Sequence, residues 1–251
     1  MPYPPATSRK WNRAFYQRLQ RIIGVTLLKN PQRIERIIKG LTMPSLTDVA
    51  MGSAKRMNAS ILFFDLENFT GVTSRLPNEY TLYILNLITP TVMKVLANWD
   101  GVIEKNTGDG VMALLGTKTT DQFLIARDAI ESAMAIRFVM LNEIHPLLRR
   151  QELPLLNFRM GIDMGEVLLA RIGIHYNSFI TAVGSAANRA AKLQSLADSN
   201  GICIGDNLFQ HLHPVYDDFC YEGAVPDWNW KNNDGSAYHF YHYEGHWHEP
   251  T

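Results

Sequence analysis

The sequence feature that most constrains the fold is a short apolar run that ends in acidic residues. Residues 61–64 are Ile-Leu-Phe-Phe, and they are followed directly by Asp65, Leu66 and Glu67. A continuous apolar run of this length indicates a buried strand, and the first charged side chain marks where the strand reaches solvent. We therefore expect Asp65 at the carboxyl end of a central strand, where a carboxylate could bind a metal ion.

A second carboxylate lies in a predicted hairpin. Residues 102–115 form two apolar arms around Asn-Thr-Gly-Asp-Gly, the composition of a tight β-hairpin, with Asp109 at its tip. A helical stretch from about Asn78 to Asn98 precedes it, so the chain path returns Asp109 to the edge where Asp65 ends. An isolated Asp in such a position is commonly only a turn residue. Two carboxylates at adjacent strand ends, however, suit a pair of Mg²⁺ or Mn²⁺ ions.

The remaining pattern predicts an α+β fold. A helix from about Thr120 breaks before Pro154, and residues 158–172 are interpreted as two strands joined around Met164 and Gly165. There follow a strand at 179–183, a helix at about 185–197, a strand at 202–204, a helix at 206–212, and a closing strand pair at 218–222 and 237–243. This order is that of a split βαβ, ferredoxin-like fold with additions.

The N-terminal segment differs from the rest in charge. Residues 1–58 contain eleven Lys and Arg but only two acidic residues, whereas the formal net charge of the chain is +0. We divide the chain into this basic helical segment and an α+β domain over residues 59–251. Apolar residues from Arg9 to Leu28 recur at helical spacing, and Asn30-Pro31 begins a second short helix. We expect the helices to pack on the domain or its dimer mate rather than on a membrane or nucleic acid.

Cysteine and histidine usage favours structural roles, with metal binding by the C-terminal histidines as the alternative. The two cysteines, Cys203 and Cys220, lie in apolar strand-like runs, as reduced core residues of a cytoplasmic protein do. Four histidines near the end, at positions 239, 242, 246 and 248, alternate with aromatic residues and predict a last strand and a polar tail. No apolar stretch approaches the roughly 20 residues of a membrane span, and no signal peptide opens the chain. We expect no transmembrane segment and no nucleic-acid partner.

Four segments of the chain together carry a family resemblance. They are Phe-Asp-Leu-Glu-Asn-Phe-Thr at 64–70, Gly-Asp-Gly-Val-Met-Ala at 108–113, Phe-Arg-Met-Gly-Ile-Asp-Met-Gly at 158–165, and Val-Gly-Ser-Ala-Ala-Asn-Arg-Ala-Ala-Lys-Leu at 183–193. In this order and spacing they resemble the catalytic domain of class III nucleotidyl cyclases, over about residues 60–244. The resemblance implies the ferredoxin-like fold of that class and cyclisation of a nucleoside triphosphate.

The resemblance assigns a metal and phosphate site to the first strand and the hairpin. Asp65 and Asp109 match the two metal-binding aspartates, and the Leu66 carbonyl matches a backbone ligand, for two divalent cations per site. Phe69 and Thr70 match the turn that binds the terminal phosphates. Asn68 stands where the family usually has Gly, so the backbone of that turn could differ.

Other matching residues would serve a second subunit. Cyclases of this class form composite sites in head-to-tail homodimers, so the resemblance implies a homodimer. Asn188 matches the ribose-orienting asparagine, and Lys192 replaces a transition-state arginine, which keeps the charge but loses the bidentate fork. Lys231 matches a phosphate-binding lysine. The alternative is that both lysines are solvated surface residues.

Lys105 and Thr181 match the two base-reading positions. A lysine donor beside a threonine acceptor suits adenine, cytosine or uracil and disfavours guanine. The short form and the Ala-Ala-Asn-Arg-Ala-Ala-Lys-Leu segment look like the pyrimidine cyclases of bacterial anti-phage (Pycsar-type) defence. This resemblance implies cyclic UMP or cyclic CMP production, with UTP favoured, and a separate effector. The alternatives are an adenylate cyclase and a degenerate nucleotide-binding module, the latter motivated by Lys192.

Overall fold

The computed structural model describes residues 10–28, 54–174, 177–226 and 228–249. Its strands are β1 (Ala54–Leu66), β2 (Val102–Asn106), β3 (Gly110–Leu115), β4 (Phe158–Ile174), β5 (Asn177–Val183), β6 (Gly201–Gly205), β7 (Cys220–Glu222) and β8 (Phe240–Tyr243). Within these residues they form one eight-stranded sheet in the order β2-β3-β1-β4-β6-β8-β7, with β5 paired to β4. The first four strands have the ferredoxin-like order, which confirms the predicted fold class.

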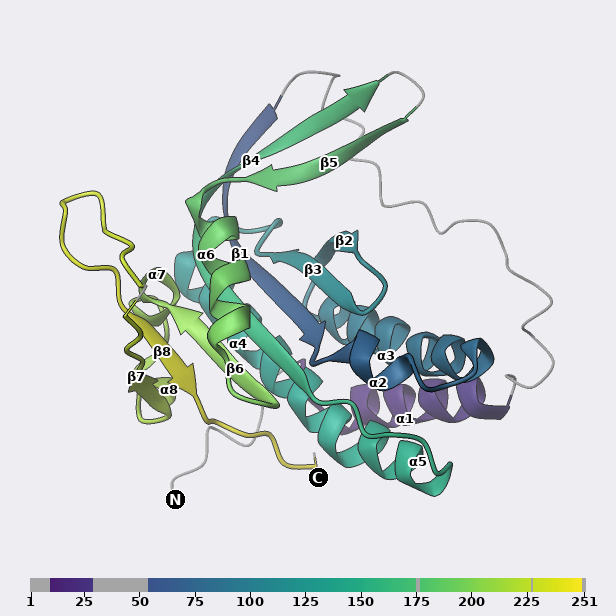
Figure 1. Cartoon of the computed structure of the whole chain (residues 1–251). Helices are drawn as coiled ribbons and strands as arrows, with labels where there is room; N and C mark the ends of the chain where they lie inside the picture. Colours follow the sequence, from purple (N-terminus) through teal and green to yellow (C-terminus); the bar gives the residue numbers. More distant parts are fainter. Residues whose placement is uncertain (1–9, 29–53, 175–176, 227, 250–251) are drawn as a thin grey trace.

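Helices cover both faces of this sheet (Figure 1). They are α1 (Arg13–Leu28), α2 (Phe69–Thr73), α3 (Asn78–Asn98), α4 (Gln122–Val139), the π-helical η1 (Met140–Ile144), α5 (His145–Arg150), α6 (Ser185–Leu196), α7 (Asp206–Phe209) and α8 (Pro214–Asp217). Because strand side chains alternate, Leu62 and Phe64 of β1 pack with α3 and α4. Ile61 packs on the other face with the alanines of α6. The central strand is thus buried on both sides, as its apolar run indicates.

The prediction of two strands joined around Met164 and Gly165 was wrong. β4 is continuous, and Met164 and Gly165 pair with Ser60 and Ala59 in the middle of the β1–β4 ladder. Gly165 serves a close approach rather than a turn, since a Cβ there would lie 3.3 Å from Ala186 Cβ of α6. The chain reverses only after β4, and β5 then runs back along it. The two strands form an arm that extends beyond the rest of the sheet (Figure 1).

The predicted N-terminal helix is α1, and it packs into the main core. Phe15 and Leu19 of α1 and the preceding Trp11 are buried with residues of α3 and α4. Trp11 also stacks on Trp247 with ring centroids 6.3 Å apart, and its Nε1–H donates to the His248 carbonyl at 3.1 Å. The N-terminal helix is therefore joined to the C-terminal part of the domain. The predicted second helix lies outside the described residues.

The C-terminal histidines form ordinary polar contacts. His239 hydrogen-bonds Glu222, and His242 of β8 lies 3.3 Å from a carboxylate oxygen of Asp198. Among the described residues, no group of three or more His, Cys, Asp or Glu side chains is placed to bind a metal. One described helix, α3, is long and apolar enough by length and composition to cross a membrane. It buries Leu87, Ile88 and other residues in the main core, as core helices of similar composition do.

Candidate active site

The structure brings the two predicted acidic residues together. Asp65 is the penultimate residue of β1 and pairs across the ladder with Gly110 of β3, which Asp109 immediately precedes. A Cβ on Gly110 would lie 2.9 Å from Asp65 Oδ1, so the hairpin backbone passes directly beside this carboxylate. Burial raises the pKa of Asp65, and the neighbouring charge of Asp109 raises it further. Two adjacent carboxylates of this kind are a donor set that fits Mg²⁺ or Mn²⁺.

The hairpin tip that carries Asp109 is held from two directions. The Thr107 N–H donates to the Gly110 carbonyl at 3.0 Å and closes the turn, in which Gly108 has a φ of +102°. The buried Thr89 of α3 donates from Oγ1 to the Gly108 carbonyl at 3.1 Å. Because the crossover helix hydrogen-bonds the turn directly, the position of Asp109 depends on α3 as well as on the sheet.

Sequence reasoning missed a cation beside the acidic pair. Arg159 of β4 pairs with Asp65 in the β1–β4 ladder, and its charge lowers the pKa of Asp65, opposing burial. The Arg159 guanidinium also donates to Glu67 at 2.5 Å, and Ser199 donates to the other Glu67 oxygen at 2.7 Å. On the α6 side, Gln194 Nε2 lies 3.5 Å from Asp65 Oδ2. Only the strand register, which sequence reasoning did not assign, could have identified Arg159.

The predicted phosphate turn follows β1 directly. The Leu66 side chain is buried in the core and has no ligand atom, so the backbone carbonyl is the group of Leu66 that could bind a metal ion. Asn68 precedes α2 with a φ of +51°, in the left-handed region that glycine favours and asparagine tolerates. Asn68 thus adopts a conformation that a glycine at this position would also allow. Phe69 is half-buried and Thr70 is exposed at the start of α2.

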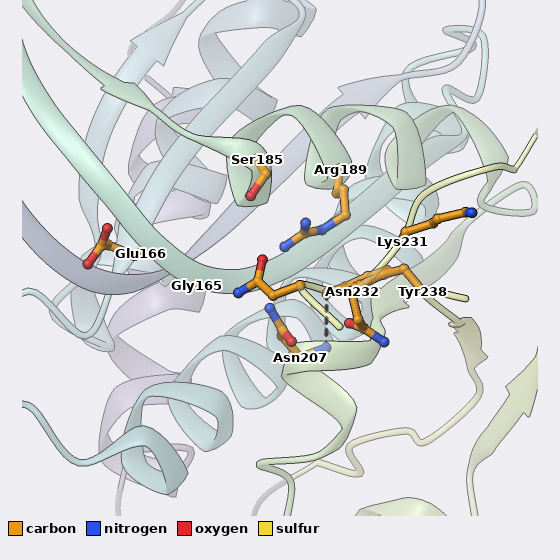
Figure 2. Close-up of a pocket in the computed structure, with 9 residues that line it drawn as sticks. Gly165, Glu166, Ser185, Arg189, Asn207, Lys231, Asn232 and Tyr238 are labelled. Carbon is orange, nitrogen blue, oxygen red and sulfur yellow. Dashed lines mark hydrogen bonds between the residues drawn. The ribbon is translucent and has the colours of Figure 1, made fainter. Parts of the chain in front are cut away.

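Three predicted site residues make no direct polar contact with the acidic pair. Asn188 and Lys192 are exposed one turn apart on α6, and Lys231 is exposed in the segment that precedes β8. Within the described part of the chain, no hydrogen bond or ion pair joins them to Asp65 or Asp109. Lys231 lines a polar pocket of about 280 Å³, shown in Figure 2. The lining residues are Gly165, Glu166, Ser185, Arg189, Asn207, Lys231, Asn232, Asn233 and Tyr238.

The two predicted base-reading residues lie on strands that are joined by a buried carboxylate. Lys105 of β2 is exposed and Thr181 of β5 is half-buried. Between them, Glu104 Oε1 accepts the Ala182 N–H of β5 at 3.3 Å. The β2–β3 register shifts between Ile103 and Lys105, so Lys105 follows a bulge. The Glu104 hydrogen bond therefore sets how β2 and Lys105 lie against β5 and Thr181.

The sequence and the fold agree with a known family. The family model for the adenylate and guanylate cyclase catalytic domain matches residues 51–225. The chain belongs to this family. The class III cyclase resemblance that the sequence motifs carry is thereby confirmed.

Named relatives of this cyclase domain differ in substrate. A cytidylate cyclase of Escherichia coli is 27% identical over 176 residues, which cover 68% of this chain and 39% of that protein. A uridylate cyclase of Burkholderia cepacia is 28% identical over 163 residues, which cover 62% of this chain and 68% of that protein. The chain thus spans well under half the length of the cytidylate cyclase and about two thirds of the uridylate cyclase.

A solved structure supports the fold. The adenylyl cyclase CyaB from P. aeruginosa superposes with a TM-score of 0.67 at 22% identity, covering 79% of this chain and 100% of that chain. At this identity the likeness concerns the fold alone. It places the arrangement of β1, the β2–β3 hairpin and β4 among class III cyclase domains.

Proposed function

We propose that this chain is a metal-dependent nucleotidyl cyclase that converts a pyrimidine nucleoside triphosphate, UTP before CTP, to its 3′,5′-cyclic nucleotide and pyrophosphate. The observation that carries the proposal is the adjacency of Asp65 and Asp109 at neighbouring strand ends in a cyclase-family domain. In the reaction the 3′-oxygen forms a bond to the α-phosphorus and loses its proton. The bond from the α-phosphorus to the bridging oxygen breaks, and pyrophosphate leaves.

The acidic pair would hold the metal ions. Asp65, Asp109 and the Leu66 carbonyl would be the protein ligands for two Mg²⁺ or Mn²⁺ ions. When bound, these ions would supply Lewis acidity at the 3′-hydroxyl and charge neutralisation at the triphosphate. The N–H groups of Phe69 and Thr70 would bind the terminal phosphates. Their position just beyond the acidic pair, at the start of α2, fits this role.

A head-to-tail homodimer would complete each site. The β4–β5 arm exposes apolar side chains that a second copy could cover; they are Leu168, Ile172, Phe179 and Val183. Asn188, Lys192 and Lys231 are exposed, so a second subunit could reach them. Asn188 would orient the ribose, Lys192 would stabilise the transition-state charge, and Lys231 would bind phosphate.

Lys105 and Thr181 would read the base. For uracil, Lys105 donates to O4 and Thr181 accepts N3–H; for cytosine, Lys105 donates to N3 and Thr181 accepts from the 4-amino group. The same pair suits adenine, so adenylate cyclase activity is the second candidate. The curated uridylate cyclases, matched over about two thirds of their length, support a pyrimidine. The product would be a cytoplasmic second messenger that activates a separate effector in bacterial anti-phage defence.

Product identification tests the proposal. Purified protein is incubated with Mn²⁺ and each of the four nucleoside triphosphates, and products are identified by mass spectrometry. Cyclic UMP or cyclic CMP supports the proposal, whereas cyclic AMP alone supports the second candidate. No cyclic product from any substrate would support a nucleotide-binding module, which the Lys192 replacement would then explain. We expect Asp65→Ala and Asp109→Ala to abolish turnover while the dimer remains.

A further inference from the structure

A buried ion pair lies beneath the helix that carries Asn188 and Lys192. Asp163 of β4 is 0% exposed and Arg189 of α6 is 6% exposed. Arg189 Nε donates to Asp163 Oδ2 at 2.5 Å, while the Tyr238 hydroxyl and the Met164 N–H donate to Oδ1 at 2.6 and 2.8 Å. A buried carboxylate is tolerated when its charge and its lone pairs are compensated in this way. Both oxygens of Asp163 have partners.

The same arginine contacts the segment that carries Lys231. The Arg189 guanidinium carbon lies 4.0 Å from the Tyr238 ring centroid and 5.9 Å from that of Trp230, both cation–π contacts. Tyr238 donates its N–H to the Trp230 carbonyl at 3.0 Å, and Lys231 pairs with Ala237 between them. One side chain of α6 therefore contacts both arms of the short turn that presents Lys231.

A pocket lies between these two elements around Ser185 and Arg189, whereas farther along α6 Leu193 and Leu196 share an apolar cluster with Trp228. Ser185 and Arg189 of α6 line one side of the 280 Å³ pocket, and Lys231, Asn232 and Tyr238 line the other. Figure 2 shows Arg189 reaching from α6 toward Gly165, while the ammonium group of Lys231 points away from the pocket. Contacts across the pocket run through Asp163, Arg189 and Tyr238.

We propose that Arg189 is a positioning residue. Together with the apolar contact of α6 to Trp228, the Asp163–Arg189–Tyr238 network sets the position of residues 230–238 relative to α6. Asn188 and Lys192 on one side and Lys231 on the other can then bind one nucleotide at the same time. Arg189 does not itself touch the substrate. The inference rests on the proposed function, because the spacing matters only if these three residues act on a common ligand.

Three variants and one control separate positioning from stability. Arg189→Lys keeps the charge but loses the planar group that stacks on Tyr238 and bonds Asp163. The double variant Asp163→Asn/Arg189→Met removes both charges, so no buried ion is left unpaired. Arg189→Met alone leaves the Asp163 carboxylate buried without its counter-charge. Glu131 lies on α4, on the other face of the sheet, and accepts hydrogen bonds from Trp99 and Tyr216 in a comparable buried network. Glu131→Gln disrupts this network. It is the control for loss of stability alone.

Turnover and hydrogen exchange are then measured on the full chain. We expect the double variant to melt near the wild-type temperature, yet to have kcat/KM about 10²-fold lower, as a misplacement of about 1 Å produces. The apparent Mn²⁺ requirement should not change, because Asp65 and Asp109 remain in place. Glu131→Gln should lower the melting temperature without this loss of kcat/KM.

Amide hydrogen exchange gives a readout that does not depend on activity. In Arg189→Lys and in the double variant, exchange should accelerate at residues 228–239 and remain unchanged in the β2–β3 hairpin. Unaltered exchange in this segment, or wild-type kcat/KM in the double variant, would overturn the inference. Failure of the wild-type protein to make any cyclic nucleotide would instead refute the proposed function. Accelerated exchange in the variants would then still show that Arg189 positions residues 228–239, but not that this positioning serves catalysis.

Discussion

Gly161→Ala is expected to displace α6 from the sheet. Gly161 lies on β4 where α6 crosses it, and a Cβ there would be 2.1 Å from Gln194 N and 2.3 Å from the Ala190 carbonyl oxygen. Ordinary contact begins at 3.4 Å, so α6 or β4 must yield by about 1.3 Å at this point. Both clashing atoms are backbone atoms, so no side-chain rotation relieves the overlap.

Both stability and turnover should fall in this variant. Overpacking of this kind costs about 1–3 kcal/mol, which lowers the melting temperature by about 2–12 °C in a domain of this size. Since α6 carries Asn188 and Lys192, a displacement of about 1 Å should lower kcat/KM about 10²-fold. Thermal denaturation followed by circular dichroism gives the first quantity, and pyrophosphate release gives the second.

Gly24→Ala on α1 is the matched control. A Cβ on Gly24 has no atom within 4 Å, so the substitution should gain up to about 1 kcal/mol from lower chain entropy and leave turnover unchanged. A Gly161→Ala protein that kept wild-type turnover and melting temperature would refute the close approach of α6 to β4 and the role assigned to this helix.

Three further perturbations test individual contacts. Asn68→Gly should keep activity within about twofold and Asn68→Val should lose about 1–2 kcal/mol of stability, because a β-branched residue resists the left-handed conformation; denaturant unfolding measures this, and equal stabilities would contradict it. Thr89→Val removes the hydrogen bond to Gly108 and should raise the Mn²⁺ concentration for half-maximal activity, whereas Thr89→Ser should not; identical metal titrations would exclude the positioning of the hairpin by α3. Burial already raises the pKa of Asp163 to about 6 although Arg189 lowers it, so loss of Arg189 in Arg189→Met should raise this pKa further. The stability deficit relative to the wild type should be largest at pH 8 and shrink as the pH falls toward 6, below which Asp163 is neutral in both proteins; a deficit independent of pH would show that Asp163 is not ionised beside Arg189.

Local sequence patterns predicted the elements that form the acidic pair. The apolar run before Asp65 and the Asn-Thr-Gly-Asp-Gly turn are short-range signals, and α3 has the predicted bounds, Asn78–Asn98. These signals sufficed to bring Asp65 and Asp109 to one edge, because a strand, a crossover helix and a hairpin admit few other paths.

Features that depend on contacts between distant residues could not be predicted in this way. Glycine is common in turns, but Gly165 lies in the middle of a strand, where α6 approaches it closely. Arg159 is one of many basic residues until the register places it opposite Asp65. Asp163 and Arg189 are 26 positions apart and belong to different elements, so their pairing is visible only in the folded chain.

The most direct test of the account is the set of products that the wild-type, Asp65→Asn and Asp109→Asn proteins make from UTP, CTP, ATP and GTP with Mn²⁺. We predict a cyclic pyrimidine nucleotide and equimolar pyrophosphate from the wild type, and neither product from either folded variant. A wild type without cyclic product, or undiminished turnover in a variant that lacks one of the two carboxylates, would contradict it.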